Sequence, residues 1–203
     1  MSRPSVAARR VAKSEYVETE SGNKISRRSH IEGKANIVLG GKTVIMAGVH
    51  MRADLHRKSE EEGKERSPTT AITIGRATVI ATNCTIRPPM RVRSGQMTFY
   101  PLRVGDNVFI GPGTHVSAIS ISSHVHIGAD CVLSPFCVVK EFCKIMPGTV
   151  VPPHMVIPPG SIVEGRPARI IGEVGEGWGQ GGGGEGEEWV EGGDLRALVR
   201  SIK

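Results

Sequence analysis

Residues 121–163 read ISSHVHIGADCVLSPFCVVKEFCKIMPGTVVPPHMVIPPGSIV and decide the fold. An aliphatic residue returns at every sixth position of this stretch: Ile121, Ile127, Leu133, Val139, Ile145, Val151, Ile157 and Val163. A helix of 3.6 residues per turn cannot keep such a stripe on one face. Because proline recurs two positions after the aliphatic residue, each unit is a short strand followed by a bend. Hexapeptide repeats of this kind build parallel β-helices.

The repeat implies a coil with three sides. Three hexapeptides close one triangular coil of about 18 residues, so each inward side chain should stack on one about 18 positions away. The spacing from Val116 to Ile121 is one residue short and predicts a tightened corner, and Thr43 falls in an aliphatic slot beside Val44. We therefore predict an all-β fold, a β-helix over residues 14–171. The same step recurs upstream at Val104, Ile110, Val116; Ile74, Ile80, Ile86; and Ile25, Ile31, Ile37.

Two segments interrupt the repeat. Residues 56–73 (HRKSEEEGKERSPTTAIT) are charged and poor in apolar side chains, which predicts a mobile surface insertion. Residues 87–101 have room for a projecting loop or for an extra coil with Val92 and Thr98 facing inward. The arginines, serine and glycine in their middle form a poor strand and favour the loop.

This second loop is the candidate partner-binding surface. Arginine and aromatic side chains are favoured at interface anchors, and a Pro-Pro pair stiffens the base of the loop. An alternative is that Phe99 and Tyr100 only pack the loop onto the coil. The predicted contact residues are Arg87, Pro88, Pro89, Met90, Arg91, Arg93, Phe99 and Tyr100.

The two ends of the chain differ from its middle. Residues 1–13 are expected to be flexible. Residues 172–203 form a glycine-rich and acidic tail, in which 173–194 hold ten glycines, seven acids and no basic residue. Within it, residues 194–202 (DLRALVRSI) predict a short amphipathic helix capped by Asp194, which would fold back to cover an end of the solenoid.

Composition excludes several functional classes. No stretch approaches the ~20 apolar residues of a membrane span, and the basic start lacks the apolar core of a secretory signal. Four cysteines do not suggest a disulfide scaffold, and 4% aromatic residues argue against nucleic-acid binding by base stacking. The net charge of +6 is concentrated in the first half, which would alternatively suit acidic partners or an anionic membrane surface.

Metal chemistry is not expected. Gamma-class carbonic anhydrases share this architecture and bind zinc through three histidines, but the equivalent of one ligand falls here on Arg87, which cannot ligate a metal. His124 and His126 should both point outward as solvated side chains, with a surface metal as the less favoured alternative. Cys131, Cys137 and Cys143 fall on three different sides of the coil, too far apart to share zinc or form a disulfide. We predict no metal and no cofactor.

Hexapeptide-repeat acyltransferases are the enzymatic alternative. Residues 162–171 (IVEGRPARII) resemble the segment that ends the β-helix in many acetyltransferases, although they would equally turn any chain off its last coil. His115 is the best candidate for a general base, but the sequence offers no evident partner for it. This alternative implies a homotrimer that binds coenzyme A; the favoured interpretation is a protein without catalytic residues.

Several segments resemble the dynactin subunit 5 family, whose members are small left-handed β-helical subunits of the dynactin pointed end. They are residues 13–55, residues 74–89 as far as the Arg87-Pro88-Pro89 corner, residues 99–110, and the coil of Cys131, Cys137 and Cys143 as far as about Pro159. The charged insertion and the acidic tail depart from the family pattern. Hexapeptides alone would not distinguish this family from acyltransferases. The specific parts of the resemblance are residues 13–16 and 21–24, the Arg87-Pro88-Pro89 corner and the loop after it.

The resemblance implies a structural role. It implies that the β-helix is left-handed and that the protein is cytoplasmic, located with dynactin on the microtubule cytoskeleton. It implies pairing with the related β-helical subunit 6, contact with the actin-related protein and a larger zinc-bearing subunit, and support of dynein–dynactin binding to cargo adaptors and endosomes.

Overall fold

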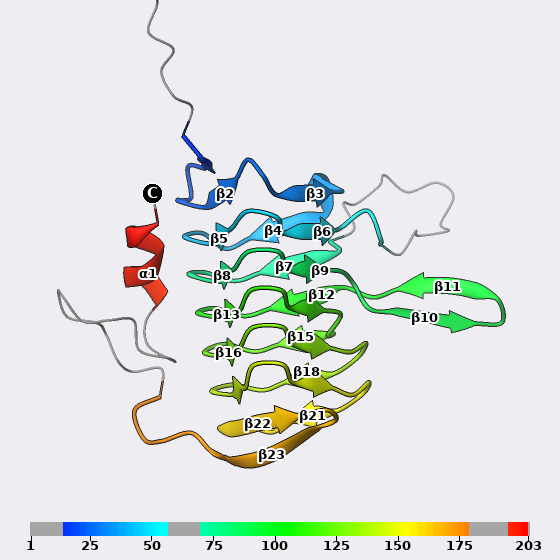
Figure 1. Cartoon of the computed structure of the whole chain (residues 1–203). Coiled ribbons are helices and arrows are strands. Elements are labelled where there is room, and N and C mark those ends of the chain that lie inside the picture. The colour runs from blue at the N-terminus through cyan, green and yellow to red at the C-terminus, as the bar shows by residue number, and fades with distance from the viewer. Residues whose placement is uncertain (1–13, 57–69, 179–194, 203) are drawn as a thin grey trace, which may run out of the picture.

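The computed structural model describes residues 14–56, 70–178 and 195–202, and its strands form three faces of a prism (Figure 1). The first face runs in the order β1 (Tyr16–Glu18), β2 (Lys24–Ser26), β5 (Val44–Ile45), β8 (Val79–Ile80), β13 (Phe109–Ile110), β16 (His126–Ile127), β19 (Lys144–Ile145), β22 (Ser161–Gly165) and β23 (Ala168–Glu173).

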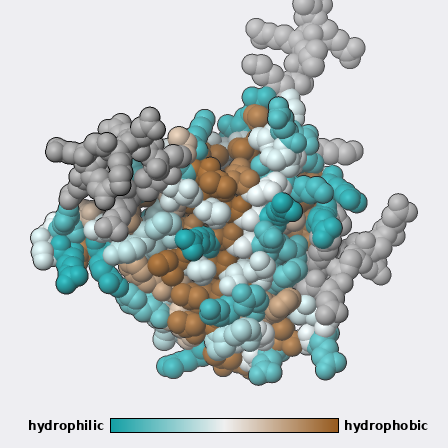
Figure 2. Space-filling model, turned by 180° about the vertical axis from the view of Figure 1, so that it is seen from behind, coloured by the Kyte–Doolittle hydropathy of each residue, from teal (hydrophilic) through white to brown (hydrophobic). Residues whose placement is uncertain are grey.

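The other two faces each have six parallel strands. The side of the prism opposite to the view of Figure 1 exposes hydrophobic as well as hydrophilic residues (Figure 2). The second face contains β3 (His30–Glu32), β6 (His50–Arg52), β9 (Thr85–Ile86), β14 (His115–Val116), β17 (Val132–Leu133) and β20 (Val150–Val151). The third face contains β4 (Ile37–Leu39), β7 (Ile72–Ile74), β12 (Leu102–Val104), β15 (Ser120–Ile121), β18 (Val138–Val139) and β21 (Val156–Ile157).

The predicted inward stacking is confirmed. Ile121 pairs with Val139, which pairs with Ile157, so residues 18 positions apart lie one above the other. All eight aliphatic residues of the 121–163 stretch have at most 1% of their surface exposed. Ile121 pairs upstream with Val104, 17 positions away, as the tightened corner requires. These columns are the hydrophobic core, which stabilises the coil by removing apolar surface from water.

The register of the first coil differs from the prediction. Ile25 pairs with Ile45, 20 positions later, because the 3₁₀ turn η1 (Lys34–Asn36) lengthens this coil. The inward position is therefore Ile45, and Thr43 is a buried corner residue whose hydroxyl donates to Gly75 O at 2.8 Å. Gly33, at the start of η1, has φ +68°, and a Cβ there would meet Asp54 N at 2.3 Å.

The two segments that interrupt the repeat differ in detail from the prediction. β7 begins at Ile72, and Ala71 and Ile72 are buried, so the last residues assigned to the insertion 56–73 belong to the coil. Residues 57–69 lie outside the described part. Residues 87–101 do project, but as an antiparallel hairpin of β10 (Met90–Arg93) and β11 (Gln96–Phe99) rather than an irregular loop (Figure 1).

The predicted C-terminal helix is α1 (Leu195–Ser201), and it packs on the outer side of the first face rather than over an end. Leu195 and Val199 are buried against Val44 and Val79. The Lys24 ammonium donates to Val199 O at 3.1 Å and to Ile202 O at 2.5 Å, which satisfies carbonyls at the end of the helix. The predicted cap Asp194 and the tail residues 179–193 lie outside the described part, as do residues 1–13.

The two ends of the prism differ in the strand that folds back there. At the C-terminal end β23 pairs antiparallel with β22, and Ile157 and Val163 of the last coil are fully buried. At the N-terminal end only β1 folds back, over β2. Within residues 14–56, 70–178 and 195–202, no helix is long and apolar enough to span a bilayer.

Candidate partner-binding surface

The hairpin has two chemically different faces. Cross-strand pairing places Val92 opposite Met97 and Met90 opposite Phe99, so these four apolar side chains share one face. The exposed fractions are 58% for Val92, 62% for Met97 and 37% for Met90. The opposite face carries Arg91 and Arg93 together with Gln96 and Thr98. We call the first set the apolar hairpin face and the second the cationic hairpin face.

Aromatic side chains fix the base of the hairpin to the coil. The Tyr100 ring packs edge-on against the Phe136 ring with centroids 5.3 Å apart, and the Arg91 guanidinium lies over the same ring at 5.0 Å. His154 stacks on Phe136 at 5.2 Å. The Tyr100 amide donates to Pro89 O at 2.9 Å and closes the hairpin. This anchoring holds the exposed strands in a defined direction, which lowers the ordering cost of binding.

The predicted contact residues therefore divide into two groups. Met90, Arg91, Arg93 and Arg87 are exposed, and Arg87 donates to the Ser117 hydroxyl at 3.1 Å. The remaining four form the base: Pro88 and Pro89 are buried, and Phe99 and Tyr100 are half-buried.

Val92 and Met97, the most exposed apolar side chains of the hairpin, were not among the predicted contact residues. The signal was present, since apolar residues alternate on both sides of Ser94-Gly95, a dipeptide suited to a tight hairpin turn. Both turn residues have positive φ, 50° and 77°, as that turn requires.

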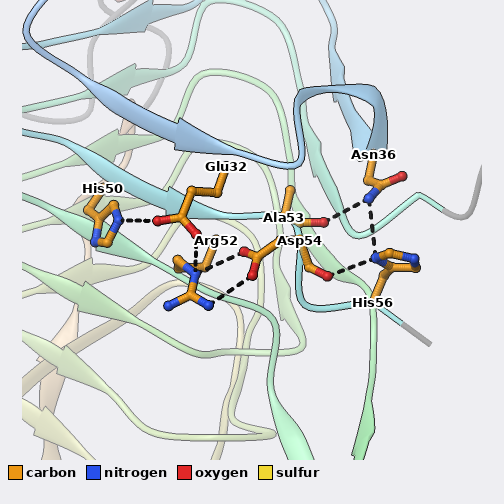
Figure 3. A network of polar contacts seen from close by, with 7 residues as sticks. All are labelled: Glu32, Asn36, His50, Arg52, Ala53, Asp54 and His56. Atoms are coloured by element: carbon orange, nitrogen blue, oxygen red, sulfur yellow. Dashed lines mark hydrogen bonds and ion pairs between the residues drawn. The ribbon is translucent and has the colours of Figure 1, made fainter. Parts of the chain in front are cut away.

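A second polar site lies near the N-terminal end of the second face (Figure 3). The Glu32 carboxylate accepts from His50 Nε2 at 3.0 Å and contacts Arg52 Nε at 3.1 Å, and Arg52 also binds Asp54 through two contacts of 2.8 Å. The hydrogen bond from Arg52 lowers the pKa of Asp54 and keeps it ionised. Asn36 Nδ2 donates to Ala53 O at 2.9 Å. The network joins β3 to β6 and leaves its acids paired with cations.

The three histidines considered as metal ligands or bases lie in different surroundings. His126 points outward as predicted, but it is buried rather than solvated and stacks on Phe109 at 5.0 Å. His124 stacks on a different ring, Phe142, at 5.1 Å. His115 is exposed on β14, where its strand neighbours are Thr85 and Val132 rather than an acid. Among the residues that the structure describes, no three His, Cys, Asp or Glu side chains gather as a metal site.

The four cysteines are buried free thiols, and those at 131, 137 and 143 precede strands of three different faces. Burial raises the pKa of Cys84 to about 11 and that of Cys137 to about 12, from a usual value of 9.0. The folded state thus keeps these thiols protonated. They act as small apolar fillers of the coil corners.

The raised thiol pKa values predict alkaline destabilisation. Their contribution to stability is complete below about pH 9 and is lost as the pH rises toward about 12, because the unfolded chain then releases protons that the folded chain retains. The free energy of urea unfolding should fall between pH 8.5 and 10.5. The difference in the free energy of unfolding between the wild-type chain and Cys137→Ala should shrink over the same pH range. A difference that does not change with pH would show that the Cys137 thiol has its usual pKa in the folded state.

Comparison with known proteins identifies the family. A family model described as "Dynactin subunit 5" matches residues 7–180. A curated relative, dynactin subunit 5 of Dictyostelium discoideum, is 39% identical over 111 residues, which are 55% of this chain and 49% of the relative. The chain thus matches about half the length of that relative.

Solved structures share the fold at low identity. AntD, an N-acyltransferase from Bacillus cereus, has a TM-score of 0.58 at 17% identity, with 75% of this chain and 80% of AntD covered. A hexapeptide transferase family protein from Anaplasma phagocytophilum has a TM-score of 0.55 at 17% identity, with 89% and 93% covered. These similarities confirm the left-handed parallel β-helix of hexapeptide repeats. The match over residues 7–180 goes further than fold, and the chain belongs to the dynactin subunit 5 family.

Proposed function

We propose that this chain is a non-catalytic structural and binding subunit of the dynactin pointed-end complex. The observation that carries the proposal is the family match over residues 7–180, combined with an anchored hairpin that presents an exposed apolar face and an exposed cationic face. In this role the β-helix is a rigid support, and the hairpin is the surface that contacts other chains. The proposed location is the cytoplasm, on dynactin bound to microtubules.

The proposed partners follow from membership of the complex. They are the related β-helical subunit 6, the pointed-end actin-related protein, the larger zinc-bearing subunit, and the cargo adaptors through which dynein and dynactin engage endosomes. The cationic hairpin face suits an acidic surface on one of these chains. The residues from Thr85 to Arg103 include four arginines and no acid, so electrostatic attraction would also speed the encounter.

Charge reversal of the cationic hairpin face tests this proposal. Arg91→Glu with Arg93→Glu should weaken incorporation into the dynactin assembly at least about tenfold, because interfacial arginines are frequent anchors and their reversal adds repulsion. The melting temperature should fall only slightly, because both side chains are exposed and the contact of the Arg91 guanidinium with the Phe136 ring is worth only about 0.5–1 kcal/mol. The measurement is quantitative co-purification of the other subunits.

Lys140→Glu with Arg169→Glu is the matched control, since it makes the same charge change at exposed positions outside the hairpin and its flanking residues. Equal recovery of subunits with both double variants would remove the hairpin from the interface.

A further inference from the structure

The first face carries an apolar patch on its outer side. Val44 of β5 and Val79 of β8 belong to a cluster separate from the core inside the prism, and both are fully buried because α1 covers them. Tyr16, Met46 and Phe109 border the patch. Without α1 these side chains would form an exposed apolar surface, of the kind that marks a binding site.

Polar side chains of the coil hold both ends of the helix. At its start the Asn107 side-chain oxygen accepts a hydrogen bond from Leu195 N at 2.9 Å. At its end the Lys24 ammonium donates to Val199 O and Ile202 O. These contacts satisfy main-chain groups that every helix leaves without an internal partner at its ends. They therefore recognise a helix by its length and not by its side chains.

The distance between these two contacts fits a helix of two turns. Asn107 precedes β13 and Lys24 lies on β2, and the strand order β2-β5-β8-β13 places three strand spacings between them. At about 4.8 Å per spacing the separation is about 14 Å, close to the roughly 12 Å that eight helical residues span. The aliphatic residues of this helical segment follow the spacing of one helix face: Leu195, Leu198, Val199 and Ile202.

α1 is expected to leave its site more readily than the strands separate. It has seven residues, and helices shorter than about 12–15 residues are marginal in water without packing. Leu195 and Val199 are buried, but Leu198 and Ile202 are only half-buried. Elements with few buried apolar contacts open first. Because α1 contributes no strand to the coil, its release would leave the three faces intact.

We infer that the outer side of the first face is a docking site for a two-turn amphipathic helix, which α1 fills and which a helix of the same pattern from another chain can enter by exchange. The partner helix needs aliphatic side chains at positions i, i+3, i+4 and i+7, and ends that reach Asn107 and Lys24. This site lies apart from the hairpin, which projects from between the second and third faces (Figure 1). Docking here therefore does not depend on the proposed role of the hairpin.

Binding of a free α1 peptide to the full chain tests the exchange. In the variant Leu195→Asp with Val199→Asp, α1 should leave its site, and a synthetic peptide of residues 194–203 should bind in its place. NMR titration should then move the methyl signals of Val44 and Val79 saturably toward their wild-type positions. A fluorescently labelled peptide should bind the wild-type chain at least about tenfold more weakly than the variant, because the attached α1 competes at a high effective concentration.

The matched control is a peptide that carries Asp in place of Leu195 and Val199, which should not move these signals. The milder chain variant Leu195→Ala with Val199→Ala should bind the unmodified peptide with an affinity between those of the wild-type and Asp-variant chains. Absence of saturable movement, the same movement with the control peptide, or equal affinity of the wild-type and Asp-variant chains would overturn the inference.

A substitution of Lys24 tests recognition of the helix end. Lys24→Met in the Asp-variant chain should weaken peptide binding about tenfold, because hydrogen bonds from a charged donor are among the stronger ones. Lys140→Met removes an exposed ammonium elsewhere on the coil and should leave the affinity unchanged. No loss with Lys24→Met, or an equal loss with both variants, would refute the capping by Lys24 that sets the two-turn length of the partner helix.

Discussion

Replacing Ile157 by Asp is expected to prevent folding of the β-helix. Ile157 is fully buried in the column formed with Ile121 and Val139. Truncation of such a side chain to Ala would cost about 2–5 kcal/mol, and an unpaired buried carboxylate costs several kcal/mol more. Because domains of this kind are stable by only about 5–15 kcal/mol, the variant should lack a cooperative unfolding transition. Circular dichroism with urea titration measures this directly.

Val156 provides the matched control. It is the neighbouring residue of the same strand and has 56% of its surface exposed. Val156→Asp should change the free energy of unfolding by less than about 1 kcal/mol, as is usual for surface substitutions. If the two Asp variants unfolded at the same urea concentration, the inward stacking of the six-residue stripe would be incorrect.

Replacing both Val92 and Met97 by Asp is expected to abolish assembly without unfolding the chain. Their side chains lie opposite one another at the centre of the apolar hairpin face and are the most exposed apolar groups there. Loss of two central interface anchors weakens binding roughly a hundredfold or more, and the added charges would be buried against a partner. The measurement is the fraction of the chain that migrates with the other dynactin subunits in size-exclusion chromatography.

Val38→Asp with Val156→Asp is the control for this pair. Both valines are exposed, by 50% and 56%, on the outer side of the third face. The control should assemble normally, and both double variants should show the wild-type urea transition. Normal assembly of the Val92/Met97 variant would show that the apolar hairpin face is free of partners.

Local periodicity carried most of the fold prediction. The spacing of Ile121 to Val163 predicted which residues face inward, since each position repeats the same short strand and bend. The prediction lost register where one coil departs from the repeat, at the 3₁₀ turn Lys34–Asn36 that moves the inward position to Ile45. A prediction based on the repeat assumes coils of constant length, so it cannot identify a single coil that is longer than the others.

The surface features were harder to predict because they depend on contacts between distant residues. Neighbours more than 16 positions away in the sequence determine the burial of His126 against Phe109 and the position of α1 on the first face. The proline pair at the base of the hairpin was assigned to the interface although Pro88 and Pro89 are buried. The alternation Met90–Val92 and Met97–Phe99 is a hairpin signal, but the arginines between these apolar residues favoured an irregular loop.

The central claim is that this β-helix supports an assembly and performs no chemistry. Mass determination of the chain purified in its native state, with mass spectrometry of every co-purified chain and an acetyl-CoA binding titration, tests it most directly. A hetero-assembly containing dynactin pointed-end subunits, with no acetyl-CoA affinity, is the predicted result. A homotrimer that binds acetyl-CoA and is protected by it from proteolysis would contradict the account and favour an acyltransferase.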